Sequence, residues 1–269
     1  MYLQHEGIRL HAKLELPDNE AEKQPLVILV HGFTGHMEER HILAVARTLQ
    51  EIGYGVLRLE LYGHGQSGGS FYDHDIKKWV AELVCAIDAM KQLDFVSELY
   101  LCGHSQGGLA VMLAAAQRPE AVKALIPLSP AWMIPQGARA GNILGMQFDP
   151  AQIPEEIPLG NGVSLSGNYL RVAQSIDVEA AIQAYRGPVL IVHGTADETV
   201  PFPFSQQAAS IYENCTLVPV EGDTHCFDRH LEQMTKAVHD MVPRQLVRPQ
   251  GRDHHFGFPD HLRDHPAGA

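Results

Sequence analysis

A serine flanked by glycines stands at residues 103–107, which read Gly-His-Ser-Gln-Gly. The apolar run at 99–102 favours a strand and the run at 109–116 favours a helix, so Ser105 falls on a strand-to-helix turn. This is the setting of a nucleophile elbow, in which the serine backbone is strained and glycines let strand and helix approach closely. The same five residues could also be a Gly/Ser turn that caps a helix. Residues elsewhere in the chain decide between these interpretations.

A serine hydroxyl is a weak nucleophile, and it needs a base within hydrogen-bond reach and an acid that orients the base. The chain order expected for this elbow is serine, then Asp or Glu, then histidine. Asp197 follows a predicted strand at 189–193, and His225 follows a predicted strand at 216–220. Because the carboxyl ends of parallel strands meet at one edge of a sheet, we predict that Ser105, Asp197 and His225 form a catalytic triad.

The acid and the base each have a plainer alternative. Asp197 could cap the helix that begins near residue 203, Glu198 beside it is a second candidate acid, and His225 could be an ordinary histidine of a surface loop. The shared sheet edge favours Asp197 and His225. A histidine acts as a base only when it is neutral, so we expect activity to fall on acidification through about pH 6.

Two backbone N–H groups are expected to stabilise the oxyanion that forms during acyl transfer. Residues 30–35 end the first predicted core strand in a glycine-containing turn, which places the N–H of Phe33 near the site. Gln106, immediately after the nucleophile, supplies the second N–H. The alternative for this turn is a simple strand ending. The glycine-rich segment 63–69 lacks the lysine of a phosphate-binding loop and is predicted to be scaffold.

The composition is that of an ordinary globular protein, with 269 residues, of which 45% are hydrophobic and 19% charged. The net charge of −12 and the lack of a Lys/Arg cluster argue against nucleic acid as a partner. The N-terminus does not read as a signal peptide, and no apolar run approaches the roughly 18 residues of a membrane helix. We therefore predict a cytoplasmic protein that does not associate with membranes.

Four cysteines occur without C-x-x-C spacing, and we expect them to be reduced and structural. Cys226 directly follows His225, which leaves a reactive thiol as an alternative at that position. The segment 249–269 holds four of the 16 histidines among scattered Gly and Pro. Metal binding by these histidines is conceivable, but such a segment more often is a tag, a fusion remnant or a solvated end. No metal site is predicted.

Strand and helix patterns alternate along most of the chain. Strands are expected at 8–16, 26–30, 56–61, 98–102, 124–128, 189–193 and 216–220, and helices at 38–52, 75–93, 105–117, 203–212 and 228–241. Such alternation predicts an α/β fold with a mostly parallel sheet and helices on both faces. Residues 131–173 interrupt this alternation, because they are rich in Gly and Pro and show no sustained hydrophobic period. We predict a cap there, inserted into a core formed by 1–130 and 174–245.

The motifs together resemble those of the α/β-hydrolase family. The resemblance rests on residues 31–33, 63–67, 103–107, 197, 200–201 and 223–225. Within the family, the chain is similar to the bacterial cinnamoyl or feruloyl esterases in its His-Gly-Phe-Thr-Gly and Gly-His-Ser-Gln-Gly-Gly segments and in residues 167–171. It departs from many relatives at Glu60, where they have Asp, and at Leu144, where some hold the phenolic hydroxyl with a polar side chain. The second departure bears on which phenolic acid the protein takes.

The resemblance implies a serine carboxylesterase that hydrolyses hydroxycinnamate esters through an acyl-enzyme and needs no metal or organic cofactor. Tyr169 and Trp132 of the inserted segment offer aromatic surface for a planar acyl group, and they are the candidate substrate-binding residues. The alternative for both is the small core of the cap. A lipase-like or monoacylglycerol-type esterase and a non-catalytic ligand-binding scaffold remain as other functions, and a homodimer stays open.

Overall fold

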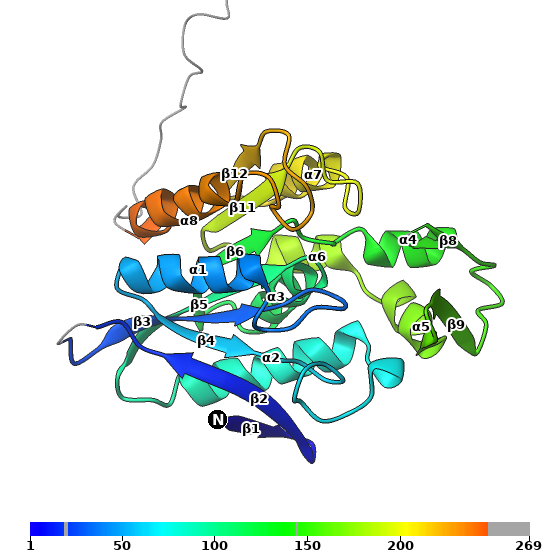
Figure 1. Ribbon diagram of the computed structural model, residues 1–269, viewed down its shortest axis with the longest axis horizontal. Helices are drawn as coiled ribbons and strands as arrows, with labels where there is room; N and C mark the ends of the chain where they lie inside the picture. The colour runs from blue at the N-terminus through cyan, green and yellow to red at the C-terminus, as the bar shows by residue number, and fades with distance from the viewer. Residues whose placement is uncertain (19–20, 144, 247–269) are drawn as a thin grey trace, which may run out of the picture.

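The computed structural model describes residues 1–18, 21–143 and 145–246 (Figure 1). Its centre is an eight-stranded sheet in the order β1-β2-β4-β3-β5-β6-β11-β12. The strands are β1 (Tyr2–His5), β2 (Ile8–Glu15), β3 (Gln24–Val30), β4 (Gly55–Leu59), β5 (Val96–His104), β6 (Val122–Leu128), β11 (Val189–Gly194) and β12 (Cys215–Val220). The pairs β1/β2 and β2/β4 are antiparallel, and the other neighbours are parallel. The predicted α/β fold with a mostly parallel sheet is confirmed.

Helices cover both faces of this sheet, as predicted. They are α1 (Arg40–Glu51), α2 (Ile76–Met90), α3 (Gln106–Gln117), α6 (Val178–Ala184), α7 (Pro203–Ile211) and α8 (Leu231–Leu246), with a short 3₁₀ helix at Phe71–Asp73. Alternate residues of β3 show why the sheet has two buried faces, because successive side chains of a strand point to opposite sides. Val27 and Leu29 belong to a cluster with α1 and α8, whereas Ile28 and Val30 belong to a second cluster with α2 and α3.

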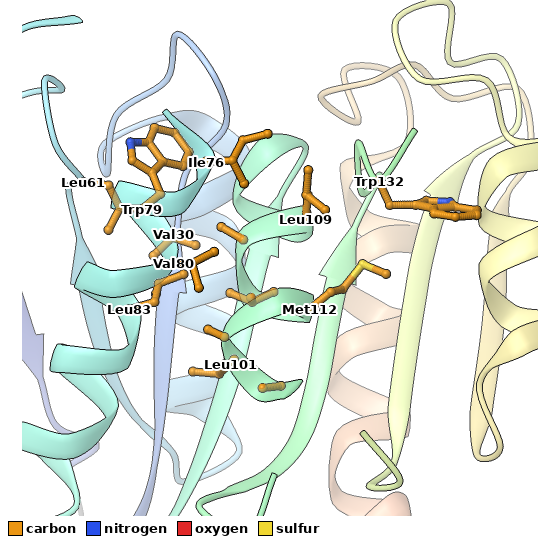
Figure 2. Close-up of a cluster of buried hydrophobic side chains, with 14 of the residues drawn as sticks. Val30, Leu61, Ile76, Trp79, Val80, Leu83, Leu101, Leu109, Met112 and Trp132 are labelled. Atoms are coloured by element: carbon orange, nitrogen blue, oxygen red, sulfur yellow. The ribbon is translucent and has the colours of Figure 1, made fainter. Parts of the chain in front are cut away.

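The second cluster is the larger, and Figure 2 shows part of it between α2, α3 and the sheet. Trp79 and Leu83 of α2 meet Val30 and Leu101 of the central strands there, and all four side chains are fully buried. Strands covered on both faces need no polar positions, which explains the continuous apolar runs of the central strands. The core therefore holds β3 and β5 rigidly, and these strands carry two of the predicted catalytic loops.

The segment between β6 and β11 contains more regular structure than its sequence predicts. Besides α6, it holds α4 (Ile134–Ala140), β7 (Asn142–Ile143), β8 (Met146–Gln147), β9 (Glu156–Gly160), β10 (Val163–Ser166) and α5 (Asn168–Gln174). Two small antiparallel hairpins, β7/β8 and β9/β10, lie apart from the main sheet. Elements this short cannot show a hydrophobic period, which requires a window of about 11–18 residues. The division into core and cap stays a prediction, and the histidine-rich segment 249–269 lies outside the described residues.

Candidate active site

Ser105 lies at the sharp turn between β5 and α3. Its backbone has φ 55° and ψ −119°, a conformation that non-glycine residues rarely adopt. The flanking glycines allow this turn, because a Cβ on Gly103 would lie 2.3 Å from the Gly107 carbonyl oxygen. A Cβ on Gly107 would lie 2.2 Å from the carbonyl oxygen of His31. The structure thus has the strained backbone and the close strand-to-helix approach of a nucleophile elbow.

Asp197 and His225 meet at the same edge of the sheet, from the loops after β11 and β12. His225 Nδ1 lies 2.7 Å from Asp197 Oδ2. The other carboxylate oxygen, Oδ1, accepts hydrogen bonds from the backbone N–H groups of Thr199 and Val200, each at 2.8 Å. Because Nδ1 donates its proton to the carboxylate, Nε2 of His225 is free to accept a proton. The structure brings the predicted acid and base into direct contact.

A second histidine contacts the same carboxylate. His193 Nε2 lies 2.9 Å from Asp197 Oδ2, and the Ser205 hydroxyl lies 2.6 Å from His193 Nδ1. All three side chains are buried. Burial alone would raise the pKa of Asp197, but hydrogen bonds from His193 and His225 outweigh burial and hold that pKa well below its ordinary value of 3.8. Asp197 is therefore a fixed anion.

His193 is not among the residues predicted above, although the sequence carries one signal for its role. The histidine is the last polar residue of an otherwise apolar strand and stands four positions before the predicted acid. A polar side chain in a buried strand needs a hydrogen-bond partner, and the loop that follows supplies it in Asp197.

Ser105 is tied to His225 through the residue before it. His104 Nε2 lies 2.9 Å from the His225 carbonyl oxygen, and the two imidazole rings are 4.7 Å apart. Among the hydrogen bonds of the described residues, none joins the Ser105 hydroxyl directly to His225. Catalytic hydrogen bonds are often long before substrate binds and shorten in the complex. The structure therefore delivers the hydroxyl to the edge where the acid and base meet, and the direct contact stays a prediction.

The loop after β3 lies against the nucleophile, where an oxyanion would form. A Cβ on Gly32 would lie 3.1 Å from Ser105 Cβ, so the loop touches the elbow. The carbonyl of Phe33 is held by His64 Nε2, a residue of the glycine-rich segment 63–69. Within the described part of the chain, the backbone N–H groups of Phe33 and Gln106 have no hydrogen-bond partner. Both donors are thus available for the predicted oxyanion hole.

The glycine-rich segment 63–69 acts as scaffold, in agreement with its predicted role. Glu60 is buried before this segment, and its carboxylate accepts hydrogen bonds from Gln66 N at 2.7 Å and from His11 at 2.8 Å. The Ser67 hydroxyl donates to the Glu60 carbonyl at 2.6 Å. The segment thereby holds His64 in place against the oxyanion loop.

Tyr169 reaches the site from α5. Its hydroxyl donates to Gln106 Oε1 at 2.6 Å, and its ring lies 5.7 Å from that of Phe33 and 5.4 Å from that of His74. The side chain is buried, and burial raises the pKa of its hydroxyl, which stays protonated as a donor. The ring is thus next to the oxyanion loop, but the hydroxyl is engaged with Gln106. Direct binding of substrate by Tyr169 stays a prediction.

Trp132 lies between β6 and α4, at the start of the segment that contains the two hairpins. Its indole Nε1 donates to the Phe204 carbonyl at 2.7 Å, so its polar group is used within the protein. The ring borders a cavity of about 510 Å³. That cavity is lined mainly by polar side chains of α4, of the region from the end of α5 to the start of α6, and of α7, and its lining includes neither Ser105 nor His225. Substrate binding by Trp132 therefore stays a prediction.

The four cysteines are free. Burial and neighbouring acidic groups raise the pKa of Cys226 to about 11, so its thiol is protonated at neutral pH and is not an activated nucleophile. No helix in the described ranges has both the length and the apolarity needed to cross a membrane.

The chain is similar to several known proteins. The family model described as serine aminopeptidase, S33, matches residues 21–156. A solved structure described as ferulic acid bound to Est1E from Butyrivibrio proteoclasticus is 53% identical and superposes with a TM-score of 0.90. That match covers 92% of this chain and 100% of the other.

Two curated relatives are more distant. The mitochondrial palmitoyl-protein thioesterase ABHD10 of Rattus norvegicus is 27% identical over 199 residues, or 70% of this chain. The match spans 63% of that relative, so this chain covers less than two thirds of its length. The monoacylglycerol lipase of Mycolicibacterium smegmatis is 24% identical over 226 residues, which cover 72% of this chain and 77% of the lipase.

Proposed function

Since this chain belongs to the α/β-hydrolase family of serine esterases, we propose that it hydrolyses esters of hydroxycinnamic acids through an acyl-enzyme. The observation that carries the proposal is the likeness to Est1E, which is 53% identical over nearly the whole chain and was solved with ferulic acid bound. Ferulic acid is a hydroxycinnamic acid, and an acid released by ester hydrolysis is a product of the acyl site. The substrate class follows from this similarity.

Each chemical step has a group of this chain to perform it. His225 takes the proton of Ser105 while the serine oxygen attacks the ester carbonyl, and the N–H groups of Phe33 and Gln106 stabilise the oxyanion. The tetrahedral intermediate collapses, the C–O bond to the alcohol breaks, and His225 returns the proton to the leaving oxygen. Water, deprotonated by His225, then attacks the acyl-enzyme and releases the acid. Asp197 holds the imidazole in one tautomer and stabilises its protonated form.

Aromatic side chains beside the oxyanion loop suit a planar acyl group. The ring of Phe33 lies 5.5 Å from that of Phe71 and 5.7 Å from that of Tyr169, each in an edge-on arrangement. Such rings provide apolar surface with a defined shape, which favours a flat conjugated acid over a flexible acyl chain. We propose that residues 131–173 form a cap over this surface and that Tyr169 and Trp132 belong to the acyl site.

A second candidate function is that of a lipase-like esterase with longer acyl chains. The similarity to the Mycolicibacterium smegmatis monoacylglycerol lipase favours it. A flexible chain would need an apolar tunnel, whereas a hydroxycinnamate needs a short flat slot. The two functions therefore differ in how activity depends on acyl length.

The deciding experiment compares kcat/KM for methyl ferulate with that for para-nitrophenyl esters of increasing acyl length. Preference for methyl ferulate, with activity falling as the acyl chain lengthens, supports the proposal. Activity that rises steadily with chain length would support the lipase instead. Labelling by a fluorophosphonate that Ser105→Ala abolishes distinguishes either esterase from a non-catalytic binding protein, which would hydrolyse neither ester and would not be labelled.

A further inference from the structure

A group of three side chains that the proposed reaction does not use includes the sequence neighbours of Ser105 and His225. We call it the His41 cluster, and it consists of His41 on α1, His104 at the end of β5 and Cys226 in the loop after β12. One nitrogen of each histidine and the cysteine sulfur all lie within 4.8 Å of one another. Three elements far apart in the sequence thus bring two imidazoles and a thiol to one point.

Both histidines of the cluster have one buried ring nitrogen without a hydrogen-bond partner. His41 Nε2 and His104 Nδ1 are inaccessible to solvent, and neither has a hydrogen-bond partner among the described residues. The two side chains are each only 3% exposed. A buried polar atom that makes no hydrogen bond is unfavourable, and such atoms in native proteins usually have an additional partner such as a water or an ion. Two such nitrogens in a cluster that also holds a thiol therefore point to a bound species.

The tautomer of His104 shows that its unpartnered nitrogen can act as a metal ligand. His104 Nε2 contacts the carbonyl oxygen of His225 at 2.9 Å, and a carbonyl can only accept, so Nε2 carries the hydrogen. Nδ1 therefore carries a lone pair that no group of the described residues uses. Histidines that bind metals commonly donate their other N–H to a backbone carbonyl in this way. Burial lowers the pKa of His41 to about 4 and that of His104 well below 6.5, so both imidazoles are neutral and can act as ligands.

We propose that His41 Nε2, His104 Nδ1 and Cys226 Sγ bind one thiophilic divalent cation of the Zn²⁺ type, with water or another small ligand in the fourth position. Two nitrogens and one sulfur are a ligand set that Zn²⁺ prefers. With Zn–N near about 2.0 Å and Zn–S near about 2.3 Å, ligand atoms around one tetrahedral ion lie about 3–4 Å apart, so the cluster needs only a modest contraction.

The charge around the thiol is suited to a cation. Asp228, Glu39 and Asp197 all act electrostatically on Cys226. These groups make the site negative, which offsets part of the cost of bringing in a dication. Cys226 binds as the thiolate, so the S–H bond breaks and its proton passes to solvent as the sulfur–metal bond forms. Two of the ligands, His104 and Cys226, adjoin Ser105 and His225 in the sequence, so the ion would lie next to the candidate active site.

The first test is a titration of the full chain with Co²⁺, followed by the near-ultraviolet charge-transfer band of a cobalt–thiolate bond. The histidines of 249–269 cannot produce this band, because it requires sulfur. We expect the band to saturate at one equivalent and Zn²⁺ to remove it. Cys226→Ser should abolish the band, and the matched variant Cys85→Ser should retain it. A missing band, or a band that survives Cys226→Ser, would overturn the proposal.

A second measurement needs no variant and so does not depend on how a variant folds. Iodoacetamide labelling of the wild-type chain, followed by peptide mass spectrometry, reports each cysteine separately with and without Zn²⁺. We expect Zn²⁺ to slow labelling of Cys226 about 10-fold or more and to leave Cys85 unchanged, because a metal-bound sulfur is unavailable to the reagent. In His41→Gln the protection should be lost. Equal labelling of Cys226 with and without Zn²⁺ would refute the site.

Discussion

His193 Nε2 lies 2.9 Å from Asp197 Oδ2, the same oxygen that His225 Nδ1 contacts at 2.7 Å. One buried carboxylate oxygen thus accepts from two imidazoles. The hydrogen bond from His193 draws electron density away from the hydrogen bond between Asp197 and His225. The Ser205 hydroxyl contacts His193 Nδ1 and thereby fixes the orientation of the His193 ring. His193 is therefore a positioning residue that acts on the base through Asp197.

Removing the donor at position 193 tests this role. We expect His193→Phe to lower kcat/KM about 10-fold to 100-fold, because Asp197 loses one of the bonds that fix it. His193→Gln, which keeps an N–H donor, should recover part of the lost kcat/KM. Equal losses in the two variants would assign His193 to structure alone.

Tyr169→Phe separates two roles for the phenol hydroxyl. The hydroxyl donates to Gln106 Oε1, and Gln106 supplies an N–H to the proposed oxyanion hole. We therefore expect kcat to fall about 3-fold to 10-fold for methyl ferulate and phenyl acetate alike, because a misplaced oxyanion donor affects every ester. Steady-state kinetics with both esters measures this. A rise in KM confined to methyl ferulate would instead place the hydroxyl on the substrate ring.

The elbow should not tolerate a methyl group at its second glycine. A Cβ on Gly107 would lie 2.2 Å from the backbone carbonyl oxygen of His31, which cannot move without shifting β3. Gly107→Ala is expected to reduce the free energy of unfolding by about 3 kcal/mol or more. Gly68→Ala is the matched control, because its nearest neighbour is a side-chain methyl of Ile8 at 3.3 Å. Urea denaturation compares the two, and similar stabilities would contradict the packing argument.

Glu82 makes stability depend on pH. Burial raises its pKa to about 8, and its carboxyl accepts from the Tyr62 N–H at 2.8 Å. The pKa of Glu82 in the folded protein exceeds its unfolded value of 4.5. The contribution of Glu82 to the free energy of unfolding is therefore complete below pH 4.5 and is lost as the pH rises through about 8. In Glu82→Gln the side chain at position 82 cannot ionise, so this variant does not lose stability through that group as the pH rises.

The free energies of unfolding of wild type and Glu82→Gln should therefore diverge between about pH 5 and about pH 9, by about 3–5 kcal/mol in favour of the variant. Denaturant titrations at the two pH values measure the divergence. Glu120→Gln, an exposed change, controls for the general effect of removing a negative charge. A gap that stays constant with pH would show that Glu82 does not titrate in this range.

The sequence by itself determined the alternation of strands and helices and the loops that carry Ser105, Asp197 and His225. This was possible because each central strand is a continuous apolar run, and the carboxyl ends of parallel strands meet at one edge whatever their order. The turn at 103–107 could also be predicted, since its two glycines and its serine lie within five consecutive residues. These features depend on neighbours within the chain.

Only the tertiary structure decided which side chains meet across elements. Tyr169 of α5 contacts Gln106, which lies 63 positions earlier in the sequence, and ligand atoms of His41 and Cys226 come within 4.8 Å of each other although the two residues are far apart in the sequence. The helices and hairpins of the segment 131–173 could not be predicted from the sequence, because elements of two to seven residues are too short to show a hydrophobic period. Contacts between distant residues depend on how the layers pack, and local pattern carries no record of that packing.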